Sequence, residues 1–174
     1  MIFYRHPSTD AAPGLCYGRW NVGLGPEAEA EIEAACAAPP GFAYIVSSPA
    51  WRARRLAEAL AAATGAPLEF DERLQEMNFG RWEGEFWAEI DRAESDPWAE
   101  NPWDNAPPGG ESYSMVHSRI GAALLEAPPG GCFVTHAGPI RAAMMIQRGL
   151  SFAEAFADPV PFATPIDMGL RPDG

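Results

Sequence analysis

Apolar and polar positions follow two different periods along this chain of 174 residues. Short apolar runs, typical of buried strands, alternate with longer stretches in which apolar residues recur every three or four positions, typical of helices. The runs that predict strands are 2–5, 43–46, 68–70 and 132–135, with one more around 166–170. The stretches that predict helices are 26–38, 50–63, 85–92, 111–126 and 138–149. This alternation predicts an α/β fold in which helices cover a mostly parallel sheet.

Two of the helical stretches show which face they bury. In 50–63, the apolar positions expected to face the sheet are Trp51, Leu56 and Leu60. In 111–126 they are Val116, Ile120 and Leu124. The segment 95–110 contains four prolines and two tryptophans and is predicted to be one long irregular loop. No internal repeat or linker interrupts the pattern, so we expect residues 1–174 to form a single domain.

Composition excludes several classes of function. The net charge of -12 argues against a nucleic-acid partner, which would need clustered positive charge. All 12 basic residues are arginine, a bias typical of GC-rich coding, so arginine alone does not mark a site. Cys16, Cys36 and Cys132 fit neither a metal-ligand spacing nor a disulfide framework. With no leader segment and no apolar run of membrane-spanning length, a reduced cytoplasmic protein without a membrane partner is expected.

Polar residues suited to anion binding follow three of the predicted strands. In chain order these residues are Arg5-His6, Ser47-Ser48 and His136. Because parallel strands place their carboxyl ends at one edge of a sheet, we expect them to share a cleft. Arg52, in the first turn of the next helix, and the free N–H groups of the helix starting near Gly138 would add positive charge there. A neutral imidazole can act as a nucleophile, and a guanidinium can hold several oxygens of an anion.

Each of these residues also has a simpler interpretation. A lone histidine at a strand end is more often structural than catalytic, and Arg52, beside Arg54 and Arg55, could belong to a solvated helix face. Their shared order along the chain favours a common site over three independent structural roles.

Five segments together resemble the histidine phosphatase family, also called phosphoglycerate-mutase-like. They are Arg5-His6, 47–60, 73–84, 107–112 and 134–141. The resemblance implies a three-layer α/β sandwich and phosphoryl transfer through a phosphohistidine, with no metal and no cofactor. The implied substrate, and hence the partner, is a small-molecule phosphomonoester.

The resemblance also implies a role for individual residues. His6 would be the nucleophile, and Arg5, Arg52 and His136 would bind the phosphoryl oxygens, with His136 counted among the catalytic residues. Glu76 would donate a proton to the leaving oxygen, although without its flanking motif it would be read as a surface carboxylate. Glu111 would align an arginine or a histidine.

The chain departs from the family pattern beside the nucleophile. Pro7 replaces the usual glycine and so removes a backbone N–H. Ser8 and Ala12 stand where an acidic residue and an asparagine are common. These changes affect outer phosphate contacts, and the residues of the central pocket are retained.

A narrower resemblance lies in 13–24, which is similar to the branch containing α-ribazole phosphatases. It makes α-ribazole 5'-phosphate one candidate substrate and implies Tyr17 and Gly18 as substrate-binding residues. Trp20, Trp98 and Trp103 could also stack on an aromatic substrate, although loop aromatics more often simply pack.

The function expected from these residues is a metal-independent phosphomonoesterase that acts on a small phosphorylated metabolite. Phosphoglycerate-mutase-type transfer is the alternative activity, but the stretch between Glu76 and His136 is short for a mutase cover. A non-catalytic protein that binds phosphorylated ligands is the third possibility, although it would not need a matched nucleophile and acid.

Overall fold

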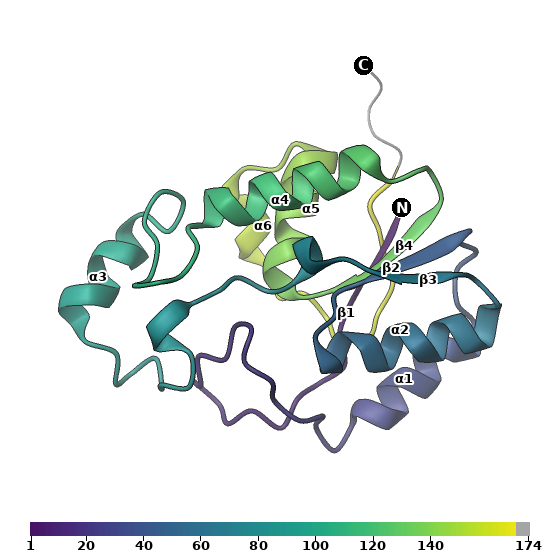
Figure 1. Ribbon diagram of the computed structural model, residues 1–174, viewed down its shortest axis with the longest axis horizontal. Coiled ribbons are helices and arrows are strands. Elements are labelled where there is room, and N and C mark those ends of the chain that lie inside the picture. The colour runs from purple at the N-terminus through teal and green to yellow at the C-terminus, as the bar shows by residue number, and fades with distance from the viewer. Residues whose placement is uncertain (170–174) are drawn as a thin grey trace.

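A five-stranded sheet forms the centre of the part of the chain described by the computed structural model, residues 1–169 (Figure 1). Its strands are β1 (Ile2–Arg5), β2 (Tyr44–Ser47), β3 (Leu68–Phe70), β4 (Gly131–Thr135) and β5 (Ile166–Asp167). The strand order is β3-β2-β4-β1-β5. All neighbouring pairs are parallel except β1 and β5, which are antiparallel. The mostly parallel sheet expected from the sequence is therefore confirmed.

Helices cover both faces of the sheet (Figure 1). They are α1 (Ala28–Ala37), α2 (Trp51–Thr64), α3 (Arg92–Glu100), α4 (Tyr113–Glu126), α5 (Ala137–Arg148) and α6 (Phe152–Ala157). Phe3 and Phe133, stacked with their ring centroids 4.8 Å apart, belong to the core cluster shared with α4 and α5. Tyr4 and Val134, the next residues along the same strands, belong to the cluster shared with α1 and α2. Alternate strand residues thus pack into two separate cores, one on each face of the sheet, which confirms the three-layer α/β sandwich.

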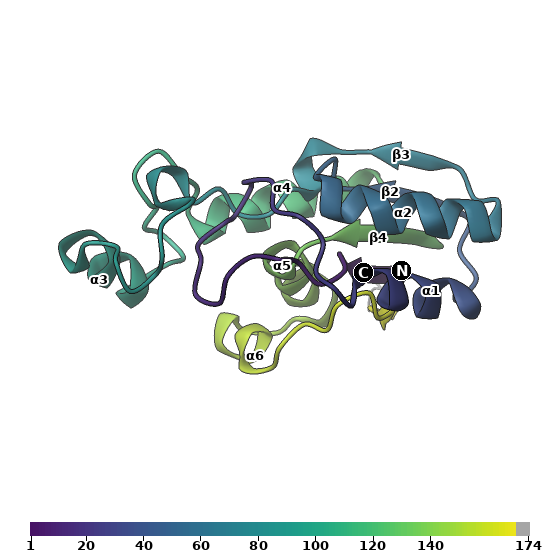
Figure 2. The same cartoon turned by 90° about the horizontal axis from the view of Figure 1, so that it is seen from below.

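The segment between β3 and α4 differs from its prediction. No helix covers 85–92, because the backbone there pairs with the N-terminal loop: Glu85 O accepts from Cys16 N (2.9 Å), and Trp87 N donates to Gly14 O (2.9 Å). The predicted loop 95–110 begins instead within helix α3, which lies at one end of the molecule, away from the sheet (Figure 2).

Tertiary contacts explain why α3 forms despite Pro97 in its interior. The Asp91 side chain caps the helix by accepting from Ala93 N (2.9 Å). Trp98 stacks on Trp87, with ring centroids 5.6 Å apart, and makes an edge contact with Phe79 at 5.9 Å. Capping and aromatic packing therefore outweigh the local proline signal.

Three smaller predictions also change. Trp51 is 49% exposed and does not face the sheet, whereas Leu56 and Leu60 are buried as expected. Helix α6 was not predicted, although Ser151 and Glu154 form the capping box that its sequence permits. The last strand ends at Asp167, and residue 170 of the prediction lies outside the described residues. Within residues 1–169, no helix has the length and apolar character needed to cross a membrane.

Candidate active site

The sheet edge where β1, β2 and β4 end brings the predicted anion-binding residues together. Backbone pairing continues one residue past β1 and β2, since His6 N donates to Thr135 O (2.9 Å) and Ser48 N donates to Val134 O (2.9 Å). His6 and His136 consequently lie side by side, with ring centroids 5.0 Å apart. The parallel register of the sheet creates this pairing from residues that are far apart in the sequence.

The His6 ring is held in one tautomer by its neighbour. His6 is 1% exposed, and its Nδ1 lies 2.6 Å from the carbonyl oxygen of Pro7. Because a carbonyl can only accept, Nδ1 carries the proton and Nε2 keeps its lone pair. Burial, together with the charges of Arg52 and Arg5, holds the pKa of His6 well below its usual value, so the imidazole is neutral at neutral pH. Pro7 therefore supplies the acceptor that His6 needs, although it lacks an N–H.

Ser48 orients the second histidine. Its Oγ lies 2.8 Å from His136 Nε2 and accepts from the backbone N–H of Ala50 (3.3 Å). This contact occupies Nε2 and leaves Nδ1 as the ring nitrogen without a contact to Ser48. Burial lowers the pKa of His136, and the nearby Arg52 charge lowers it further. Within residues 1–169, the buried Nδ1 has no hydrogen-bond partner, so it is available to an oxygen in the cleft.

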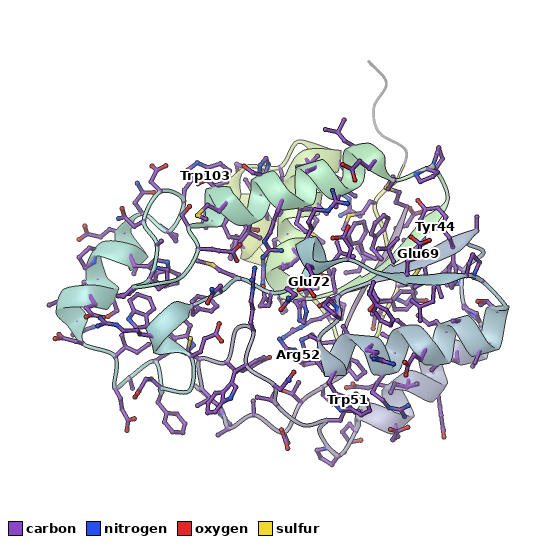
Figure 3. All side chains as sticks on the ribbon, in the orientation of Figure 1. Tyr44, Trp51, Arg52, Glu69, Glu72 and Trp103 are labelled. Carbon is purple, nitrogen blue, oxygen red and sulfur yellow. The ribbon has the colours of Figure 1, made fainter. Side chains whose placement is uncertain are left out.

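Arg52 lies in the first turn of α2 and is 1% exposed (Figure 3). This burial excludes the solvated helix face that was the simpler interpretation. Its Nη1 donates to Trp20 O (3.0 Å) and its Nη2 to Gly18 O (2.6 Å), so the loop carrying Tyr17 is fastened to the guanidinium. Burial lowers the pKa of Arg52 and the Glu76 charge opposes that effect, which leaves a cation in the cleft.

Arg5 is anchored on the other side of His6. Its Nη1 donates to Val160 O (2.8 Å), and its guanidinium carbon lies 3.8 Å from the centroid of the Phe162 ring. A guanidinium above an aromatic face is stabilised by the ring electrons. Both arginines are thus positioned by protein contacts before any ligand binds.

Glu76 reaches the cleft from the segment between β3 and α3. Its Oε1 accepts from Met77 N (2.9 Å), and its Oε2 accepts from Gly138 N (3.3 Å) in the first turn of α5. A Cβ atom at Gly138 would lie 2.3 Å from Oε1 of Glu76. Glycine is therefore required at 138 for this close approach.

Two arginines that sequence reasoning missed support the Glu76 backbone. The Glu76 carbonyl oxygen accepts from Arg19 Nε and from Arg119 Nη2, both at 3.1 Å. Glu111 binds both arginines: its Oε2 lies 3.0 Å from Arg19 Nη2, and its Oε1 lies 3.0 Å from Arg119 Nε. As expected, Glu111 aligns arginines, and its place in the PGGES segment was the signal that pointed to them.

Other predicted residues lie elsewhere or have a different contact. Gly18 is buried, and its carbonyl oxygen accepts a hydrogen bond from Arg52. The Tyr17 ring lies 5.2 Å from the Arg52 guanidinium carbon, at the border of the cleft. Trp103 packs near the start of α4, with its ring centroid 6.1 Å from that of Tyr113 (Figure 3). Among the described residues, no group of three His, Cys, Asp or Glu side chains could hold a metal ion.

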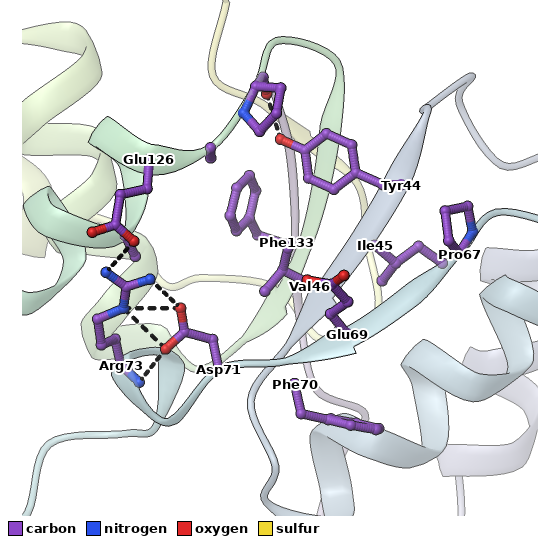
Figure 4. Close-up of a pocket in the computed structure, with 13 residues that line it drawn as sticks. Tyr44, Ile45, Val46, Pro67, Glu69, Phe70, Asp71, Arg73, Glu126 and Phe133 are labelled. Atoms are coloured by element: carbon purple, nitrogen blue, oxygen red, sulfur yellow. Dashed lines mark hydrogen bonds and ion pairs between the residues drawn. The ribbon is translucent and has the colours of Figure 1, made fainter.

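A separate cavity of about 350 Å³ lies over β2 and β3, and none of the candidate active-site residues lines it (Figure 4). Three of its four charged groups pair with one another, since Arg73 binds Asp71 (2.7 Å) and Glu126 (2.8 Å). The Tyr44 hydroxyl donates to the carbonyl of Pro128. These pairings leave few polar groups of the cavity free to bind a ligand, in contrast to the cleft at the strand ends.

Comparison with known proteins identifies the superfamily to which the sequence is similar. The family model of the histidine phosphatase superfamily (branch 1) matches residues 1–164. A bifunctional protein of Mycobacterium tuberculosis is 36% identical over 128 residues, which cover 69% of this chain and 35% of that protein. A probable phosphoglycerate mutase of Salmonella paratyphi B is 36% identical over 99 residues, or 52% of this chain and 45% of the other. The chain thus spans only about a third to a half of the length of these relatives.

A solved structure extends the similarity to the fold. The mycobacterial glucosyl-3-phosphoglycerate phosphatase superposes with a TM-score of 0.76 and 28% identity, covering 90% of this chain and 82% of the other. The similarity in fold thus includes most of both chains.

Proposed function

This chain belongs to the histidine phosphatase superfamily (branch 1), and from that premise we propose that it is a metal-independent phosphomonoesterase acting through a phosphohistidine. Its neighbours in the superfamily are phosphatase-like and mutase-like proteins. We propose that residues 1–174 form one catalytic domain, with His6, Glu76 and His136 as catalytic residues and Arg5, Arg52 and His136 as the phosphate-binding set.

The observation that carries this proposal is the hydrogen bond of 2.6 Å between His6 Nδ1 and Pro7 O. It leaves Nε2 as a free nucleophile in a neutral ring, and the low pKa of His6 maintains that state at neutral pH. The Arg52 and Arg5 guanidiniums beside this ring supply positive charge for the oxygens of a phosphoryl group.

The reaction would proceed in two transfers. His6 Nε2 attacks phosphorus, the bond from phosphorus to the ester oxygen breaks, and Glu76 gives its proton to the departing oxygen. Water then attacks the phosphohistidine while Glu76 takes a proton from it, so inorganic phosphate leaves and His6 is restored. Arg5, Arg52 and the Nδ1–H of His136 would hold the three equatorial oxygens in both steps.

The substrate is a small phosphorylated metabolite in this proposal, and α-ribazole 5'-phosphate is one candidate. Tyr17 and Gly18 are proposed to border its organic part, and the place of the Tyr17 ring beside Arg52 supports this for Tyr17.

Phosphoglycerate-mutase-type transfer is the second candidate, favoured by the similarity to a probable phosphoglycerate mutase. A non-catalytic phospho-ligand-binding protein would also use the cationic cleft.

Hydrolysis of p-nitrophenyl phosphate in the presence of a chelator tests the proposal directly. We expect release of nitrophenol that the chelator does not reduce, an acid-labile phosphoenzyme after rapid quenching, and loss of both in His6→Ala. The control variant is His117→Ala, which replaces a histidine on α4 outside the cleft. Wild-type rates in His6→Ala would refute the mechanism, and binding of phosphate without turnover in the native protein would favour the binding role.

A further inference from the structure

Glu76 also lines an apolar cavity of about 360 Å³. Glu76 and Gly138 form the side of the cavity nearest His136. Aromatic side chains and a proline supply most of the remaining wall: Phe79, Trp98, Pro102, Tyr113, Phe152 and Phe156. This volume lies in the range of small-molecule sites. Because Glu76 is the proposed proton donor to the leaving oxygen, the alcohol part of the substrate would lie beside this wall.

The aromatic wall is packed as a unit. Phe152 and Phe156 stack with ring centroids 4.3 Å apart, and each meets the Tyr113 ring edge-on at 5.1 Å. Phe156 nevertheless remains 39% exposed, so it presents apolar surface to whatever enters the cavity. Burying that surface against an apolar group would be favourable, because it removes apolar area from water.

The polar groups of this cavity are largely engaged by the protein. The Tyr113 hydroxyl donates to Gly138 O (2.9 Å). Arg141 donates from Nε to Ala155 O and from Nη2 to Asp158 O, both at 3.2 Å, and its guanidinium carbon lies 4.8 Å from the Phe156 ring centroid. Among residues 1–169, Arg141 is the only basic residue of the lining, and two of its nitrogens are occupied, so the cavity is poorly equipped to receive a carboxylate.

We infer that this cavity selects the alcohol part of the substrate and that it favours phosphomonoesters of apolar or aromatic alcohols without a second negative charge. The inference rests on the proposed phosphatase function. It assigns substrate selection to Phe156 and its aromatic neighbours, while the phosphate is held by the cleft at the strand ends.

The inference is tested with alkyl phosphates whose leaving groups have similar basicity, so that chemistry contributes little to the difference. We expect kcat/KM for 2-phenylethyl phosphate to exceed that for ethyl phosphate about tenfold or more, from the apolar area buried, and to exceed that for 3-phosphoglycerate further. In Phe156→Ala the ratio between 2-phenylethyl and ethyl phosphate should fall about fivefold. Phe70→Ala is the matched control: Phe70 is 44% exposed on β3, outside this cavity, and its loss should leave the ratio unchanged.

A binding measurement separates this inference from the proposed function. Titration calorimetry with 2-phenylethylphosphonate and ethylphosphonate reports the same preference without turnover, and Phe156→Ala should reduce it. Equal affinities together with His6-dependent hydrolysis would overturn the inference and leave the phosphatase function standing. A clear preference without hydrolysis of any ester would refute the phosphatase function alone. A higher kcat/KM for 3-phosphoglycerate than for 2-phenylethyl phosphate would also overturn the inference.

Discussion

The two halves of the site are built in different ways. The half around His6 grows from the ends of three adjacent strands, and its side chains His6, His136, Ser48 and Arg52 are at most 1% exposed. The half around Glu76 comes from loops and from helices outside the sheet, and Glu76 itself is only partly buried. Backbone pairing fixes the first half, whereas side-chain contacts hold the second. We infer that the phosphate chemistry is the rigid part of this site and that substrate choice belongs to the adaptable part.

The largest effect should follow from removing the buried cation of the rigid half. In Arg52→Met we expect kcat/KM for p-nitrophenyl phosphate to fall about a thousandfold, because a donor aimed at the transferring group is lost. The loop held through Gly18 O and Trp20 O would also lose its anchor. Arg54→Met, on the exposed side of the same helix, is the control and should stay near the native value. Equal losses in the two variants would contradict a phosphate role for Arg52.

On the other side of the cleft, Glu76→Gln should separate leaving groups by their basicity. For alkyl phosphates we expect kcat/KM to fall about a hundredfold, since an alkoxide leaves badly without a proton. For p-nitrophenyl phosphate, which needs less protonation, the loss should be roughly tenfold smaller. Steady-state kinetics of both esters, with exposed Glu72→Gln as the control, checks this. The same loss for both esters would show that Glu76 is not the acid.

A smaller effect on activity is expected from removing one hydroxyl of the rigid half, that of Ser48. Ser48→Ala removes the hydroxyl that contacts His136 Nε2, so the ring loses the contact that orients it, and kcat should fall about tenfold with less change in KM. Ser48→Thr, which keeps the hydroxyl, should restore most of the activity. Ser47→Ala removes a neighbouring buried hydroxyl that bonds to a backbone carbonyl and serves as the control. A loss confined to KM, or no rescue by threonine, would argue against this positioning role.

The smallest effect is expected on the pH dependence of the free energy of unfolding. Because the folded-state pKa values of His6 and His136 lie below the unfolded value near 6.5, the unfolded chain binds more protons below that pH. The free energy of unfolding should therefore fall as pH decreases from 6.5 toward the folded values, by up to about 1.4 kcal/mol per pH unit for each histidine. Urea unfolding at pH 7.5, 6.5 and 5.5 measures this slope.

A double variant provides the check on that slope. Replacing His6 and His136 together with asparagine should flatten the dependence between pH 6.5 and 5.5. Burial also lowers the pKa of His117, and His117→Asn should change the pH dependence less than the double variant does. An unchanged slope in the double variant would assign the pH dependence to other groups.

Much of the rigid half was predictable because its signals are local. Strand-like runs followed by Arg5-His6, Ser47-Ser48 and His136 predict one shared edge whenever the strands are parallel, and they are. The stripe of Val116, Ile120 and Leu124 was likewise buried as expected.

The adaptable half was not predictable from local patterns. Residues 85–92 were expected to form a helix, but their backbone bonds to the loop around Cys16. Helix α3 forms where four prolines and two tryptophans predicted an irregular loop, because Trp87 and Phe79 pack against Trp98. Arg19 and Arg119 gave no signal of their own, since arginine is the chain's only basic residue apart from histidine.

The sequence by itself determined the fold class and the family, because apolar periodicity and short motifs lie in neighbouring positions of the chain. It also predicted the residues that we propose for phosphoryl transfer. Only the tertiary structure decided which imidazole nitrogen is free, how Glu111 joins two arginines behind Glu76, and that an aromatic cavity lies beside that carboxylate. These features depend on contacts between segments distant in the chain, and their geometry exists only once the sheet and its covering helices have packed.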